Sequence, residues 1–156
     1  MLFRSQCEVY SADITQLAVT RAKFRALAKD YVILPERLSE DPLAPAYRFD
    51  DPQWAAVVTW TVTALIQAEE SGVSRANLAA SRASTDPVIQ RLLGTKGHIG
   101  HALGLADDWV ARAIAAVGNY GEMFDRDLGA GSRLKLERGV NGLWTKEGLL
   151  YASPIR

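Results

Sequence analysis

The stretch Cys7–Asp13 reads CEVYSAD, and Ile14–Val19 continues it as ITQLAV. Cys7–Ser11 is typical of a short buried strand, and Ile14–Val19 places apolar residues at the spacing of a helix. Asp13 lies at the junction between them. In open α/β folds, ligands bind where the carboxyl ends of strands meet the starts of helices. Asp13 is therefore a candidate binding residue, and its carboxylate suits a cation such as an ammonium group.

The sequence around this junction predicts a strand, a helix and a second strand over residues 6–35. The helix covers about residues 14–28, and the apolar run Tyr31–Leu34 ends at Pro35, which favours a second strand. Two strands alone do not make a stable sheet, and parallel strands joined by a helix normally belong to a larger one. We therefore expect an α/β fold whose remaining strands lie upstream of Met1.

The rest of the chain is predicted to be mostly helical. Residues 36–50 read as an extended connector with a short strand at Tyr47–Phe49. Asp51-Pro52 predicts the start of a long helix that ends at Gly72, because Asp and Pro are favoured where helices begin and Gly where they end. An irregular tail closes the chain, and the shorter helices before it cover about residues 87–94, 98–103, 107–117, 119–127 and 132–144.

The composition is that of an ordinary soluble domain. The chain has 156 residues, of which 48% are hydrophobic and 23% charged, so it is long enough to build one core. Lys plus Arg and Asp plus Glu both number 18, which gives a formal net charge of zero. This balance argues against nucleic-acid partners and against a polybasic membrane surface. No apolar run approaches the roughly 20 residues of a membrane span, and Met1–Ser5 does not resemble a signal peptide.

Residue types that carry catalysis or bind metals are sparse. His98 and His101 are the only histidines, and the sequence near them supplies no third ligand of the kind that a catalytic zinc site requires. Cys7 lies in a predicted buried strand, where a thiol is usually inert. We therefore expect a protein that is not an enzyme and that carries no metal or cofactor.

The aromatic and acidic pairs have simple structural explanations. Trp54 and Trp109 lie on apolar faces of predicted helices, so we expect both to pack in the core. Glu69-Glu70 and Asp107-Asp108 lie at helix ends, where we expect them to be solvated or to cap. Asp13 is followed three residues later by a glutamine, which is the pattern of a capping box. Both roles stay open for Asp13, because a capping carboxylate can also face a cleft.

Cys7–Asp13, together with Leu17-Ala18 and Arg21, resembles a motif of the periplasmic solute-binding proteins of general L-amino-acid ABC transporters. The collinear similarity covers nearly the whole chain from Cys7, although Ser5-Gln6 stands where the family has Gly-Arg. It continues through Tyr31–Glu36 and is strongest towards the end of the chain. The strongest blocks are Val117–Phe124, Leu134–Gly139, Leu143–Lys146 and Pro154–Arg156.

The resemblance implies that this chain is the C-terminal portion of a type II periplasmic-binding-protein fold with two α/β lobes around a cleft. Residues 6–35 would form the end of the second lobe and a hinge strand, and residues 36–156 the mainly helical C-terminal part of the first lobe. Proteins of the family capture free L-amino acids in the periplasm and deliver them to ABC permease subunits. By the resemblance, Asp13 matches the acidic residue that binds the α-amino group, whereas the arginine for the α-carboxylate has no counterpart here.

The resemblance also implies that this portion binds poorly alone. One ion pair in near-water contributes about 1 kcal/mol or less, against about 8 kcal/mol for micromolar affinity. It further implies an unpaired strand edge at Cys7–Ser11 and an exposed apolar face. The alternative is a self-contained helical protein-interaction module without a small-molecule ligand, which would be compact and would expose no such edge. The preferred amino acid is not determined by this sequence.

Overall fold

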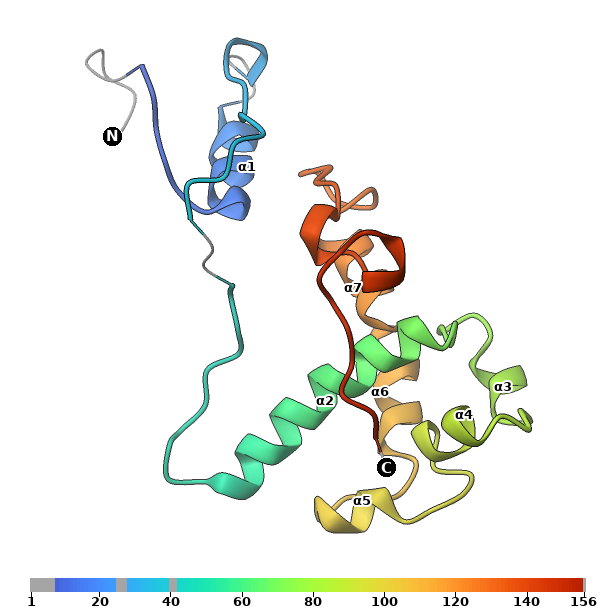
Figure 1. Cartoon of the computed structure of the whole chain (residues 1–156). Helices are drawn as coiled ribbons and strands as arrows, with labels where there is room; N and C mark the ends of the chain where they lie inside the picture. Colours follow the sequence, from blue (N-terminus) through green and yellow to red (C-terminus); the bar gives the residue numbers. More distant parts are fainter. Residues whose placement is uncertain (1–7, 25–27, 40–41, 156) are drawn as a thin grey trace.

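The computed structural model describes residues 8–24, 28–39 and 42–155. Near the N-terminus lie α1 (Ile14–Lys23) and the 3-10 turn η1 (Ala28–Asp30), apart from a larger helical body, residues 51–155 (Figure 1). An extended stretch joins the two regions. The body contains α2 (Pro52–Glu70), α3 (Leu78–Ser81), α4 (Pro87–Leu92), α5 (Ile99–Ala102), α6 (Trp109–Val117), α7 (Tyr120–Asp127), η2 (Gly139–Asn141) and η3 (Trp144–Lys146).

Local chemistry sets both ends of α2. The side chain of Asp51 accepts a hydrogen bond from the backbone N–H of Trp54 at 2.9 Å. Pro52 occupies the first helical position, where its missing N–H would have no partner in the helix. Gly72 follows the helix with a φ of +68°, a left-handed conformation that glycine adopts without strain. The predicted helix from Asp51-Pro52 to Gly72 is confirmed.

The core forms around the second half of α2. Five consecutive residues, Ala64–Ala68, are buried, so the helix is enclosed on every side there. Helices α4, α6 and α7 pack against α2. Trp109 is buried in this core, as predicted. Trp54 is 53% exposed, contrary to prediction, because it lies in the first turn of α2, well before the buried run Ala64–Ala68.

The predicted βαβ start is not confirmed. Within the described residues, 8–11 and Tyr31–Leu34 adopt no regular structure, and Val9 and Val32 are largely exposed. The predicted short strand at Tyr47–Phe49 is also absent, while Cys7 lies outside the described residues. Strands exist only as hydrogen-bonded neighbours, and apolar, β-branched sequence does not by itself supply a neighbour. The described part of the chain is mostly helical, with one isolated parallel bridge between Leu143 and Leu150.

Most predicted helices are confirmed, with tighter bounds. α1 begins at Ile14 as predicted and ends at Lys23, before residues 25–27, which lie outside the described residues. α7 begins with a complete capping box, in which the Asn119 side chain accepts from the backbone N–H of Glu122 at 2.9 Å and Glu122 Oε2 accepts from the backbone N–H of Asn119 at 2.8 Å. The helix predicted over about residues 119–127 is confirmed, with Asn119 as its N-cap.

The predicted helix over residues 132–144 is wrong. In the described part of this segment, only the short turns η2 and η3 are helical. Lys135 and Gly139 have φ values of +52° and +49°, which interrupt a right-handed helix. Gly148 lies so close to Gly142 that a Cβ atom on Gly148 would stand 1.8 Å from the Gly142 carbonyl oxygen. The segment is therefore a tightly folded loop.

The end of the chain is an integral part of the helical body. Ile155 is buried in the core formed around α2. The side chains of Gln67 and Glu70, near the end of α2, accept hydrogen bonds from the backbone N–H groups of Ile155 at 3.4 Å and Ala152 at 3.1 Å. These bonds fasten the last residues along α2. Across the described residues, no helix combines the length and apolar character needed to cross a membrane.

Candidate functional site

Asp13 occupies the N-cap position of α1. Its backbone carbonyl accepts the first hydrogen bond of the helix, from the N–H of Leu17 at 2.9 Å. Its exposed side chain accepts no capping hydrogen bond from the first turn of α1, so the predicted capping box with Gln16 is wrong although the position is right. The carboxylate thus stands at the start of a helix without serving the helix, and is available to a cation.

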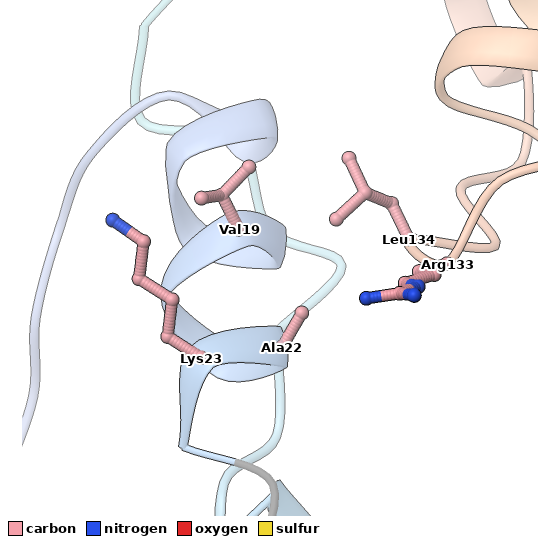
Figure 2. A pocket seen from close by; sticks show the side chains of 5 residues that line it. All are labelled: Val19, Ala22, Lys23, Arg133 and Leu134. Atoms are coloured by element: carbon pink, nitrogen blue, oxygen red, sulfur yellow. The ribbon is translucent and has the colours of Figure 1, made fainter.

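A shallow hollow of about 580 Å³ lies between α1 and the loop that contains Arg133 and Leu134 (Figure 2). Val19 and Ala22 face Leu134 across it, while the ammonium of Lys23 extends away from the hollow. Asp13 is not among the described residues that line it. Ten residues of helix separate Asp13 from Lys23, a rise of about 15 Å. The structure therefore does not combine Asp13 and these basic residues into one site.

His98 and His101 form a cluster with Asp107. The two imidazole rings stack with centroids 5.6 Å apart, and His98 Nδ1 donates a hydrogen bond to Asp107 Oδ2 at 2.9 Å. This bond, with the charges of the histidines, holds the pKa of Asp107 below its ordinary value of 3.8. Nowhere in the described residues do three or more His, Cys, Asp or Glu side chains gather to hold a metal.

Asp107 and Asp108 do not cap α6, contrary to one of the two roles expected for them. Asp108 lies at the N-cap position without a side-chain capping bond. It pairs instead with Arg112 at 2.9 Å and, more distantly, with Arg82 at 3.8 Å. These two ion pairs and the His98–Asp107 bond tie the residues before α6 to their surroundings.

The strongest polar arrangement in the helical body was missed by sequence reasoning. Arg138 donates to both carboxylate oxygens of Glu69, at 3.0 and 3.1 Å, and to the carbonyl oxygen of Asn141. Its guanidinium lies over the rings of Tyr120 and Phe124, 5.5 and 5.2 Å from their centroids. The Glu69 side chain is only 13% exposed, so the expectation of a solvated or capping carboxylate was wrong. The sequence signal that could have indicated this ion pair is the mostly apolar run Ala64–Ala68, which directly precedes Glu69 on the predicted helix.

Relatives of known type match nearly the whole chain, although no model of a protein family matches it. The general L-amino acid-binding periplasmic protein AapJ of Rhizobium johnstonii is 46% identical over 153 residues, 97% of this chain and 45% of that protein. The glutamate/glutamine/aspartate/asparagine-binding protein BztA of Rhodobacter capsulatus is 46% identical over 96% of this chain and 44% of its own length. The putative amino-acid ABC transporter-binding protein YhdW of Escherichia coli K12 is 38% identical over 97% of this chain.

The fold matches as well. An ABC transporter periplasmic binding protein from Brucella ovis, solved with glutathione bound, superposes with a TM-score of 0.86 and 46% identity over 91% of this chain. This chain belongs to the periplasmic binding proteins of ABC transporters. It spans less than half the length of these relatives, 44% in the Brucella ovis structure. A match over 97% of the chain necessarily includes Asp13.

The expected membership in the periplasmic binding-protein family is thus confirmed. These relatives are binding proteins of transport systems, and those that are named for a ligand bind amino acids. The Brucella ovis protein holds a tripeptide instead. None of these matches tests the role of Asp13.

Proposed function

We propose that this chain is part of the amino-acid-binding component of an ABC importer, and that Asp13 binds the ammonium group of the ligand. The observation that carries the proposal is the 46% identity with two amino-acid-binding proteins over at least 96% of the chain. The exposed Asp13 carboxylate, which accepts no capping bond from α1, supports the assigned role. An ammonium group has three N–H donors and forms charge-assisted hydrogen bonds with a carboxylate.

The ligand class that fits these relatives is any compound with a free α-amino-acid head. Glutamate, glutamine, aspartate and asparagine carry this head, and so does glutathione, whose first peptide bond is formed by the γ-carboxyl group of its glutamyl residue. A carboxylate that reads only the α-ammonium group accepts all of them. Asp13 would then fix the head of the ligand and leave the choice of tail to other residues.

The arrangement of this chain within the whole protein follows the same proposal. Residues 6–35 belong to the second lobe and the hinge, and residues 36–156 to the first lobe. The separation of α1 from the helical body by an extended stretch supports this division (Figure 1). The protein works in the periplasm and delivers its ligand to the permease subunits of the importer. The exposed apolar side chains of the extended stretch argue against a self-contained interaction module.

The isolated chain should bind amino acids weakly, because a single exposed ion pair contributes about 1 kcal/mol or less. The test therefore uses a chimera in which this chain replaces the matched region of the Rhizobium johnstonii protein. Calorimetry with glutamate, glutamine and glutathione is compared for the chimera, its Asp13→Asn variant and an Asp30→Asn control. Asn keeps the shape of Asp and removes its charge, while Asp30 is an exposed acid elsewhere in the N-terminal region.

Asp13→Asn should weaken binding of every ligand by about 10- to 100-fold, the equivalent of a charge-assisted hydrogen bond worth about 1.5–3 kcal/mol. Asp30→Asn should leave affinity unchanged. Binding by the chimera that survives Asp13→Asn would refute the role of Asp13. Absence of binding in a correctly folded chimera would refute the proposed function of the chain.

A further inference from the structure

The sequence contains one Asn-Gly pair, Asn141-Gly142, in the loop of residues 139–150. An asparagine followed by glycine is especially prone to spontaneous deamidation, because glycine has no Cβ atom to hinder its backbone nitrogen. That nitrogen loses its proton and attacks the side-chain carbonyl carbon of the asparagine, ammonia leaves, and a cyclic succinimide forms. Water then opens the ring, either to aspartate or to isoaspartate, in which the backbone runs through the side chain and gains a methylene group.

The folded loop withholds the attacking nitrogen. Gly142 is buried, whereas Asn141 is exposed. The Gly142 N–H donates a hydrogen bond to the carbonyl oxygen of Gly139 at 2.9 Å, and loss of its proton would leave this buried acceptor without a donor. The Gly142 carbonyl in turn accepts from the backbone N–H of Leu150 at 3.0 Å. These bonds fix both sides of Gly142, so ring closure has to wait until the loop opens.

Arg138 fixes the other member of the pair. Its Nε and Nη2 atoms donate to the carbonyl oxygen of Asn141 at 3.0 and 2.7 Å, and its own carbonyl accepts from the Asn141 N–H at 2.9 Å. The guanidinium is held in turn by both carboxylate oxygens of Glu69 on α2. Hydrogen bonds from a charged donor are stronger than neutral ones, so this ion pair fastens the loop to α2.

The closed loop also contains a conformation that favours opening. Glu147 has a φ of +61°, in the left-handed region that residues other than glycine seldom adopt. Such a residue persists only where its surroundings hold it in place. Segments of this kind open locally, without unfolding of the whole protein. We therefore expect the loop to open when Arg138 releases it.

We propose that Asn141 is a modification site whose deamidation is gated by the Arg138–Glu69 ion pair, and that isoaspartate at this position locks the loop open. The lock follows from the packing around Gly142. A Cβ atom on Gly148 would stand 1.8 Å from the Gly142 carbonyl oxygen, so the two glycines meet without spare room. The additional backbone methylene of isoaspartate shifts Gly142 within this contact, and the modified loop no longer closes.

The gate is tested by incubating the 156-residue chain in mildly alkaline buffer. Peptide mass spectrometry locates deamidation, and labelling with an isoaspartyl methyltransferase counts isoaspartate. Arg138→Met should accelerate deamidation of Asn141 about tenfold or more, because the rate follows the population of the open loop. Glu69→Gln, which keeps one acceptor oxygen for Arg138, should give a smaller increase. Asn77 and Asn119, which are not followed by glycine, should stay intact.

Two further variants separate local opening from general instability. Asn119→Ala removes hydrogen bonds at the start of α7 and leaves those of the loop in place, so it should hardly change the rate at Asn141. Gly142→Ala, combined with Arg138→Met, should suppress the reaction because its Cβ hinders the attacking nitrogen. Gly142 has a φ of −71° and a ψ of 160°, which alanine adopts without strain.

Hydrogen exchange tests the lock. In the closed loop, the N–H groups of Leu149 and Leu150 donate to the carbonyl oxygens of Val140 and Gly142. In the isoaspartate form, purified by ion exchange, these two amides should exchange about tenfold faster or more. Asn141→Asp has the charge of the modified residue without the additional methylene, so both amides should stay protected in this variant.

Four outcomes would overturn the proposal. Asn119→Ala could accelerate deamidation as much as Arg138→Met, which would mean that the site opens only by global unfolding. Arg138→Met, or Glu69→Gln if Arg138→Met does not fold, could deamidate at the rate of the unmodified chain. The unmodified chain could react as fast as a peptide of residues 138–144. The isoaspartate form could also keep Leu149 and Leu150 protected, which would refute the lock.

Discussion

Replacing Arg138 with Met should destabilise the protein by about 3 kcal/mol, because it breaks a nearly buried ion pair that joins the C-terminal segment to α2. Arg138 makes two hydrogen bonds to Glu69 and further bonds to the carbonyl oxygen of Asn141. A hydrogen bond to a charged group contributes about 1.5–3 kcal/mol. Removing one partner of a buried pair costs about 3–5 kcal/mol, since the other charge is left unpaired.

The structure sets where in this range the effect should fall. The Arg138 and Glu69 side chains are 22% and 13% exposed, so water can partly solvate the carboxylate that Arg138→Met leaves behind. This favours the lower end, about 3 kcal/mol. Glu69→Gln keeps the shape and one acceptor oxygen, and should cost about 2 kcal/mol. The double variant should cost about 1–2 kcal/mol less than the sum, because the two residues interact directly.

Urea unfolding followed by tryptophan fluorescence and far-UV circular dichroism measures these free energies. Trp109 lies in the core and reports on the helical body. The matched control is Arg48→Met, which breaks an ion pair with Asp50 whose side chains are 84% and 66% exposed. The control should cost no more than about 0.5 kcal/mol. Arg138→Met at the level of this control, or strictly additive effects of Arg138→Met and Glu69→Gln, would refute the reasoning.

Asn119→Ala should lower the free energy of unfolding, measured with urea, by about 2 kcal/mol. It removes the side-chain oxygen that accepts from the Glu122 N–H at the start of α7, and the hydrogen bond that Asn119 donates to the Val73 carbonyl at 2.8 Å. A decrease below about 0.5 kcal/mol would contradict this expectation. The His98 bond lowers the folded-state pKa of Asp107, so the stability it contributes is present above the unfolded pKa of about 4 and is lost as the pH falls through the folded value. Asp107→Asn should therefore lower the urea midpoint at pH 6, and the difference from the unmodified protein should shrink as the pH falls through the folded-state pKa of Asp107. A difference independent of pH would disprove this.

The local signals in the sequence were reliable. Asp51 and Asn119 cap the helices predicted to begin after them, and Gly72 ends α2, because each of these features depends on a few neighbouring residues and on the conformations they prefer. Asp13 was also placed correctly at the start of a helix. The capping bond of its side chain was wrong, since a carboxylate at an N-cap can turn to the helix or away from it, and its binding role stays a prediction.

The features that needed distant partners were missed or misjudged. Arg138 and Glu69 are 69 positions apart, and neither residue type announces a partner so far along the chain. Trp54 and Trp109 both lie on apolar stretches of helix, but only Trp109 meets other helices that cover it. The strands expected in the N-terminal region failed for the same reason, because a strand is stabilised by a neighbour.

The sequence by itself determined where the capped helices α2 and α7 begin, the family and the position of Asp13, since these follow from short patterns and from collinear similarity. Only the tertiary structure decided which acids are paired, which tryptophan is buried and which apolar segment stands uncovered. The physical reason is that burial and ion pairing are properties of surfaces that folding brings together, so they depend on residues that lie far apart in the sequence.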